Sequence, residues 1–392
     1  MGNTGVIARG IVTPIFRQGD DIVNLICDNL LEAAKRDGFS LNDKDIVGVT
    51  EAVVGRTQGN YASLDQIAED VRAKFGGGTI GIVFPILSRN RFAYVLKGIA
   101  RGSDKVIIQL SYPCDEVGNQ LIDISDCDEN GVNTVSDSFS EKQFRDIFGT
   151  NTKHRFTGID YIEYYKEVAG NCEIVFSNDP KYILNYTKNV LCCDIHTRHR
   201  TKSLITKAGA EKCLCLDDLL TASVNGSGFS EYGLLGSNMA TEESVKLFPR
   251  DTKEFVTALQ SRLLKLTGSK LEVMVYGDGC FKDPVGGIWE LADPVVSPAF
   301  TDGLAGTPNE IKIKYVADND YADLSGQELT DSVREHIRNK DSDLVGDISA
   351  EGTTPRRIYD LVGSLCDLVA GSGDRGTPVV LVQNYFKNYA SD

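Results

Sequence analysis

The sequence predicts an α/β protein in which an α+β body, formed by both ends of the chain, carries an inserted module built on a parallel, doubly wound sheet. A length of 392 residues is too great for one ordinary core. From Gly78 onward, apolar stretches alternate with short helical patterns, which is typical of a parallel sheet covered on both faces. After Leu220 the composition changes to a loop containing glycines. We therefore expect a body over 1–77 and 221–392 and a module over 78–220.

The body begins with a β-branched stretch over 5–16, which predicts its first strand. Asp20 and Asp21 then open a helical pattern, because the helix dipole favours negative charge in the first turn. A second apolar strand over 45–54 ends in a polar turn with glycine, and an amphipathic helix follows over 64–75.

The module repeats the order strand, helix, strand. Its first unit has a strand over 79–85, a helix over 91–100 and a strand over 105–111. Residues 115–151 are rich in Asp, Ser, Asn and Gly, and we expect them at the edge of the sheet. The later elements keep the same alternation, with right-handed crossovers, at 173–176, 180–186, 190–195, 201–208 and 212–216.

The rest of the body follows the module. An amphipathic helix over 255–266 ends at Gly268, and a strand over 271–275 comes next. The remaining elements are an apolar segment over 311–316, helices over 325–338 and 355–370, and a strand over 379–383.

Composition and charge limit the possible partners. A net charge of −15 repels phosphate backbones, so we expect no nucleic-acid partner. Acidic clusters in a cleft can instead hold divalent cations that bridge to phosphates. No apolar run is long enough to span a membrane and residues 1–24 do not resemble a signal peptide, so we expect a cytoplasmic protein with no membrane association. The ten cysteines lie mostly in apolar stretches, which indicates reduced core thiols.

An acidic loop follows the strand over 271–275. It contains Asp278 between two glycines, and Asp283 comes a few residues later. A carboxylate at the carboxyl end of a strand, with glycines that let the backbone approach a ligand, suits a site for a metal and a phosphate. The alternative is an ordinary tight Asp-Gly turn.

A glycine loop near the C-terminus can cradle an anion. Gly373, Asp374, Arg375 and Gly376 lie between a helix and an apolar strand, where backbone N–H groups and the guanidinium could meet phosphates. The loop has Gly-x-Gly-x-x-Gly spacing, but a dinucleotide fingerprint needs the strand before it and the helix after it. A helix cap followed by a loop is the alternative.

Two further groups have functional and structural interpretations. Arg356 and Arg357 at a helix start could bind phosphate or carboxylate, or could be a solvated pair behind an N-cap. Zinc-ligand residue types gather at Cys192, Cys193, His196, His199, Cys213 and Cys215. Their spacing matches no zinc motif and favours core thiols, whereas the loop over 194–202 could bind an anion through His196, Arg198 and Arg200.

Several segments of the chain, taken in sequence order, resemble those of a known family. They are Pro14, Ile15 and Phe16 with Gly19, Asp20 and Asp21, then residues 45–59, 233–238, 263–281, 323–329 and 371–382, with Asp360 between the last two. In this order they resemble the F(420)-0:L-glutamate ligase family, which forms an amide from a carboxylate, L-glutamate and GTP. The resemblance covers about the first 60 and the last 165 residues, and residues 78–220 have no counterpart that we can align.

The sequence departs from the family pattern at several positions. Leu235 stands where the family has a metal-binding Asp, which leaves Asn238 in that loop. Glu51, Ala52 and Arg56 replace the family's Ser-Thr and Lys, and the last glycine loop has a serine in place of an acid. These departures favour a divergent member with a different substrate. A non-catalytic relative that binds a nucleotide or metabolite, and an anion-binding enzyme working through 194–202, are the alternatives.

The resemblance implies a GTP-dependent acid–amino-acid ligase that uses Mg²⁺ or Mn²⁺ and acts on a small-molecule carboxylate and an amino acid. It also implies a homodimer. The catalytic residues would be Asp278 and Arg56, and the metal ligands Asn238, Asp278 and Asp283. The nucleotide would contact Pro14, Ile15, Phe16, Glu51, Gly373, Asp374, Arg375 and Gly376, and the substrate Arg356 and Arg357.

Overall fold

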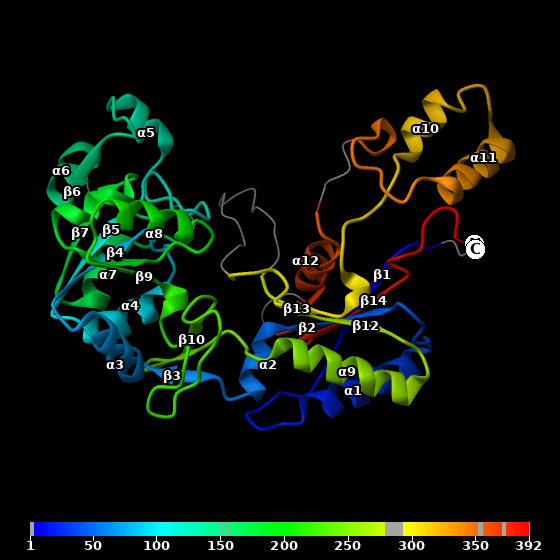
Figure 1. Ribbon diagram of the computed structural model, residues 1–392, viewed down its shortest axis with the longest axis horizontal. Helices are drawn as coiled ribbons and strands as arrows, with labels where there is room; N and C mark the ends of the chain where they lie inside the picture. Colours follow the sequence, from blue (N-terminus) through cyan, green and yellow to red (C-terminus); the bar gives the residue numbers. More distant parts are fainter. Residues whose placement is uncertain are drawn as a thin grey trace.

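The computed structural model describes residues 4–149, 152–154, 157–278, 293–351, 356–370 and 374–391. It shows two regions, each with its own central sheet, joined through a small third sheet (Figure 1). The predicted α/β class is confirmed, with an α+β body and a parallel-sheet module. Among the described residues, no helix is both long and apolar enough to cross a membrane.

The body is built on a five-stranded sheet with the order β1-β14-β2-β12-β13. Its strands are β1 (Ile7–Ile11), β14 (Val379–Gln383), β2 (Ile46–Thr50), β12 (Glu272–Tyr276) and β13 (Ala299–Phe300). Of the neighbouring pairs, only β2 and β12 run parallel, and Tyr276 lies opposite Thr50. These two strands therefore end at the same edge of the sheet.

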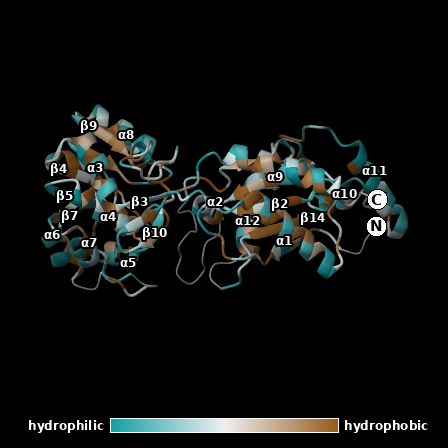
Figure 2. Cartoon of the chain, turned by 90° about the horizontal axis from the view of Figure 1, so that it is seen from below, coloured by the Kyte–Doolittle hydropathy of each residue, from teal (hydrophilic) through white to brown (hydrophobic). Residues whose placement is uncertain are grey.

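Helices cover both faces of the body sheet. Helix α1 (Ile22–Asp37) is capped by the Asp21 side chain, which accepts from the N–H of Asn24, and it packs with α9 (Thr252–Thr267) on one face. Helix α12 (Ile358–Ala370) packs on the other face. Figure 2 shows hydrophobic residues concentrated along β2 and β14, as expected for strands buried on both faces. The largely hydrophilic helix α11 (Gly326–Asn339) lies next to α10 (Ile313–Asn319), away from the sheet.

The module is built on a six-stranded sheet with the order β6-β7-β5-β4-β8-β9. All neighbouring pairs are parallel except β6 with β7. The strands are β4 (Thr79–Val83), β5 (Lys105–Leu110), β6 (Ser138–Ser140), β7 (Cys172–Ser177), β8 (Asn189–Cys192) and β9 (Lys212–Cys215). Residues 115–151, expected at the sheet edge, supply the edge strand β6.

Helices lie on both faces of the module sheet. One face packs against α3 (Leu64–Phe75), α4 (Phe92–Arg101) and α7 (Tyr161–Ala169), and the other packs against α8 (Arg198–Lys207) and a 3-10 turn over Pro180–Asn185. Two short helices, α5 (Ile124–Glu129) and α6 (Glu141–Phe148), belong to the edge excursion. Further 3-10 turns lie at Leu216–Asp218, Asp302–Leu304 and Ile348–Ala350.

A small sheet connects the two regions. Strand β3 (Tyr61–Ser63) pairs with β11 (Ser244–Lys246), and β11 pairs with β10 (Asn238–Thr241). The hydrophobic cluster of the module extends from Ala62 to Leu247 and so includes residues on both sides of 78–220. The domain division at 78–220 stays a prediction.

Candidate functional site

A cavity of about 440 Å³ lies where the two regions meet, at the carboxyl ends of β2 and β12. It brings together eight of the predicted site residues: Pro14, Ile15, Phe16, Glu51, Arg56, Asn238, Asp278 and Gly376. A larger open hollow of about 810 Å³, between residues 307–310 and 342–351, contains none of them. We take the smaller cavity as the candidate site because it gathers carboxylates and an amide from distant parts of the chain.

Asp278 is placed by the turn that follows β12. Its N–H donates to Oδ2 of Asp293 at 2.7 Å, and the N–H of Gly277 donates to the carbonyl of Val296 at 2.8 Å. A Cβ on Gly277 would lie 2.5 Å from Oδ2 of Asp293. A side chain at this position would therefore push the Asp293 carboxylate out of its present place.

Arg91 of the module reaches into this acidic turn. Its Nη2 donates to Oδ2 of Asp278 at 2.6 Å and its Nη1 donates to Oδ1 of Asp293 at 2.6 Å. Burial alone would lower the pKa of Arg91, but the charges of Asp293 and Asp278 outweigh it and raise that pKa. The guanidinium therefore stays positive and holds the acidic turn of the body against the first residues of α4.

A second buried ion pair lies beside the first. Nζ of Lys246, on β11, donates to Oε2 of Glu51 at 2.6 Å, and both side chains are buried. Glu51 is the first residue of α2 (Glu51–Thr57), directly after β2. Burial raises the pKa of Glu51 and Lys246 opposes that rise. The carboxylates that line the cavity are those of Glu51, Asp278 and Asp367, whereas Asp293 and Lys246 are ion-pair partners of lining residues.

The N-terminal turn also lines the cavity. Phe16 is buried in the body core, whereas Pro14 and Ile15 are exposed at the cavity. The N–H of Thr13 donates to the carbonyl of Gly376 at 3.1 Å, and that of Thr50 donates to the carbonyl of Pro378 at 3.0 Å. The first bond holds the last glycine loop against the start of the chain, and the second holds the residues that follow this loop against the end of β2.

Four other predicted site residues lie outside this cavity. Nη1 of Arg375 donates to the carbonyl of Val369 at 3.4 Å, near the end of α12, and the preceding residue, Asp374, is exposed. Arg356 donates to Oγ of Ser364 at 3.2 Å, and Arg357 donates to the hydroxyl of its neighbour Tyr359 at 2.8 Å. The predicted residues Gly373 and Asp283 lie outside the described residues.

The cysteines of the module do not form a single group. Sγ of Cys192 lies 3.6 Å from Sγ of Cys213, but Cys193 belongs to the hydrophobic cluster on the other face of the sheet. Interactions with the neighbouring thiols raise the pKa of Cys192, and burial raises that of Cys193. These side chains are therefore core thiols in the described part of the chain.

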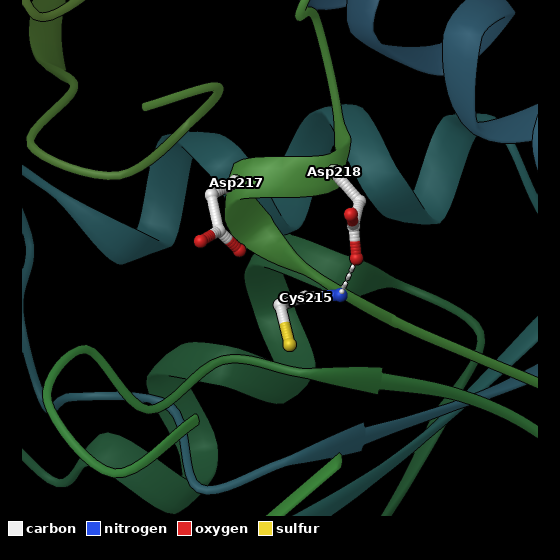
Figure 3. Close-up of side chains that lie close together, drawn as sticks. All are labelled: Cys215, Asp217 and Asp218. Atoms are coloured by element: carbon white, nitrogen blue, oxygen red, sulfur yellow. Dashed lines mark hydrogen bonds between the residues drawn. The ribbon is translucent and has the colours of Figure 1, made fainter. Parts of the chain in front are cut away.

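Cys215, Asp217 and Asp218 lie close enough together to be considered as metal ligands (Figure 3). However, Asp217 pairs with Arg198 at 2.6 Å, and Asp218 pairs with Lys202 at 2.7 Å and accepts from the N–H of Cys215 at 2.8 Å. Because cations and a backbone donor already satisfy both carboxylates, this group has a structural explanation.

The loop over 194–202 already has acidic partners within the protein. The carboxylate of Glu116 accepts from the N–H groups of Ile195 and His196. Arg198 binds Asp217, as described above. An external anion would have to replace Glu116, so the loop is a weaker candidate than the cavity between the two regions.

The donors around the cavity suit a hard divalent cation. The carboxylates of Glu51, Asp278 and Asp367 and the amide of Asn238 line the cavity and offer oxygen atoms, which Mg²⁺ and Mn²⁺ prefer. Leu235, in place of the expected acidic residue, is 1% exposed and belongs to the module core. Glu51 already pairs with Lys246, and Asp278 and Asp293 already pair with Arg91, so a divalent ion would bind here only by displacing these cations. Among the described residues, these three carboxylates do not meet as a three-ligand group. Asp293 is a carboxylate that the sequence did not indicate as a ligand.

Sequence reasoning also missed Arg91 and Lys246. A basic residue shortly after the carboxyl end of a parallel strand is a signal that could have indicated Arg91. For Lys246 the chain offers no local signal, because its partner Glu51 lies 195 residues away.

Comparison with known proteins identifies a family. No curated protein matches the chain. Among solved structures, the biosynthetic arginine decarboxylase SpeA from Campylobacter jejuni is 8% identical, over 93% of this chain and 67% of that chain, and its TM-score of 0.14 carries no argument about the fold. A family model described as F420-0:Gamma-glutamyl ligase matches residues 10–384, a range that includes 78–220. The chain therefore belongs to the F(420)-0:gamma-glutamyl ligase family.

Proposed function

We propose that this protein is a GTP-dependent amide ligase that joins a small-molecule carboxylate to the amine of L-glutamate or a related amino acid. Membership of the gamma-glutamyl ligase family supports this general class of reaction. The observation that carries the proposal is the shared cavity, in which the N-terminal turn, the carboxylates after β2 and β12, and Gly376 lie together.

The chemistry requires activation of the acid. A carboxylate is a poor acyl donor because its oxide leaving group is strongly basic. The carboxylate oxygen therefore attacks the γ-phosphorus of GTP, the bond to the β-phosphate oxygen breaks, and GDP leaves. The amine then attacks the acyl carbon of the acyl phosphate, inorganic phosphate leaves, and the nitrogen loses a proton as the amide forms. Catalysis of this kind depends on positioning and on neutralising phosphate charge.

Each group at the cavity has a role in this scheme. A bound Mg²⁺ or Mn²⁺ would supply charge neutralisation between the phosphates, held by Asp278 and Asn238 together with Asp293. Residues 14–16 and Gly376 would contact the nucleotide. Arg56, exposed on α2 at the cavity, would pair with a substrate carboxylate. We also propose that the protein works in the cytoplasm as a homodimer.

Calorimetry tests the proposal directly. GTP, and ATP for comparison, are titrated into the protein in the presence of MgCl₂. We expect binding of GTP by the wild type and its loss in Asp278→Asn, which removes a charge that the metal needs. Asp28→Asn, which changes an exposed carboxylate on α1, serves as the matched control and should bind GTP as the wild type does. Absence of nucleotide binding by the wild type would refute the proposal.

One observation favours a second candidate, a nucleotide-binding relative without ligase activity. Leu235 is buried in the module core at the position where the resemblance implies a metal-binding carboxylate. Fewer acidic ligands would weaken the hold on a metal without removing the nucleotide pocket. Binding of GTP with no phosphate release across a panel of acids and amines would favour this candidate over the ligase.

A further inference from the structure

Arg91 is the module's charged contact with the acidic turn of the body. It is the residue directly before α4, after the loop that follows β4, and its side chain is 15% exposed. Arg91 binds two carboxylates of the body. Asp278 follows β12, and Asp293 lies shortly before β13. The ion pair therefore joins two separate hydrophobic cores across the candidate site.

Arg91 binds carboxylate oxygens of Asp278 and Asp293 that a divalent cation at this site would also use as ligands. Oδ2 of Asp293 accepts the N–H of Asp278, and Oδ1 accepts from Nη1 of Arg91 at 2.6 Å, so both oxygens already have donors. Nη2 takes Oδ2 of Asp278 at the same distance. A planar guanidinium fork matches this arrangement, with one nitrogen for each carboxylate.

A guanidinium and a divalent ion cannot share these oxygens without cost. Both are cations, and a separation of a few ångströms in a partly buried site leaves their repulsion weakly screened. We propose that Arg91 and the divalent cation compete for Asp278 and Asp293, so that metal loading weakens the ion pair between module and body. The inference rests on the proposed function, because it takes a metal at this site as given. It adds that the module controls how tightly the metal is held.

Titration of Mn²⁺ alone into nucleotide-free protein provides the test, with free Mn²⁺ followed by electron paramagnetic resonance. We expect Arg91→Gln to bind Mn²⁺ roughly tenfold more tightly than the wild type, since a competing charge is gone. Arg91→Lys keeps the charge but loses the fork, so its affinity should lie between the two. Arg101→Gln is the matched control: Arg101 is the last residue of α4, the helix that Arg91 precedes, its partners Asp65 and Glu243 are more exposed, and its loss should leave Mn²⁺ affinity unchanged.

The direction in which Arg91→Gln changes the Mn²⁺ affinity shows whether Arg91 competes with the metal or only holds the carboxylates in place. If Arg91 only holds the carboxylates in place, Arg91→Gln binds Mn²⁺ no more tightly than the wild type, and the inference is overturned while the proposed function stands. If neither protein binds Mn²⁺, both the inference and the metal in the proposed function are refuted. Should Arg91→Gln fail to fold, as judged by circular dichroism, Arg91→Lys decides the matter: tighter binding than the wild type supports competition, and equal or weaker binding overturns it.

Discussion

Asp115 is a buried carboxyl group whose protonation should make the stability of the module depend on pH. It accepts from the N–H groups of Leu87, Val117 and Asn119 at 2.7, 3.1 and 2.8 Å, and also from the Asn119 amide. Burial raises its pKa to about 6, from 3.8. Because the folded-state pKa is the higher one, the folded protein binds the proton more tightly than the unfolded chain between these pH values.

We therefore expect the contribution of Asp115 to the free energy of unfolding to be complete below about pH 4 and to be lost as the pH rises through about 6. The loss amounts to roughly 3 kcal/mol over this range. Urea denaturation at a series of pH values would measure it. Asp115→Asn should be less stable throughout but should lack this slope, whereas Asp128→Asn, at an exposed position, should retain it. An unchanged slope in Asp115→Asn would contradict the assignment.

The pair between Lys246 and Glu51 should contribute more than pairs on the surface. Lys246→Met leaves the Glu51 carboxylate buried without its cation, and we expect a loss of about 3 kcal/mol in the free energy of unfolding. The double change Lys246→Met with Glu51→Leu should recover most of the loss, because it removes the charge as well. Lys97→Met, which breaks a more exposed pair with Glu243, should cost less than about 1 kcal/mol in the same urea titration. Equal costs for the two single changes would argue against this account.

At the scale of single residues, the sequence indicates chemistry but not contacts. Asp278 could be found because an Asp between glycines follows an apolar strand, and the structure places it in the cavity. Its partner Arg91 lies 187 residues away in the chain, so no local pattern could connect them. Arg375 has the type and spacing of a phosphate ligand, but it contacts a carbonyl near the end of α12.

Helices α3 and α4 pack closely at Gly102. A Cβ at this position would lie 2.6 Å from the carbonyl oxygen of Ala68, a backbone atom that cannot move alone. We expect Gly102→Ala to destabilise the protein by about 2 kcal/mol, through a forced separation of the two helices. Gly5→Ala is the control, because a Cβ there meets nothing within 4 Å. Thermal unfolding of both variants would measure the difference, and equal midpoints would show that the helices have room to adjust.

Long periodic elements were predictable and short ones were not. Continuous apolar runs identified the strands of the parallel sheet, because both faces of that sheet are buried. Strands β3, β10, β11 and β13 are two to four residues long, which is too short to show a period. β3 and β11 are defined by their pairing with each other across the chain, and β13 by its pairing with β12. The stretch over 311–316 contains the start of helix α10, whose first residue is Ile313, and has too few residues to show a helical period.

The described residues form separate hydrophobic cores, two on the faces of the module sheet and two on the faces of the body sheet. Proteins built in this way often unfold in more than one step. Differential scanning calorimetry should therefore resolve two transitions in the absence of ligand. GTP with Mg²⁺ should raise the midpoints in the wild type, since it binds the folded cavity, and should have no effect on Asp278→Asn. A single transition whose calorimetric and van't Hoff enthalpies agree would show that the two regions unfold together.

The pairing of β3 with β11 places the entry and exit of the module side by side, with Ala62 opposite Val245. Strands β2 and β12, which are parallel neighbours in the body, lie on either side of that long excursion in the chain. Bringing together the ends of so long a segment is entropically costly when it is unstructured, and contacts of such high sequence separation form slowly. Once the module has folded, its entry and exit lie side by side, so the effective loop between β2 and β12 is short and costs little entropy to close. Assembly of the body sheet should thus follow that of the module, which makes the middle of this chain the part whose early folding sets the pace for both ends.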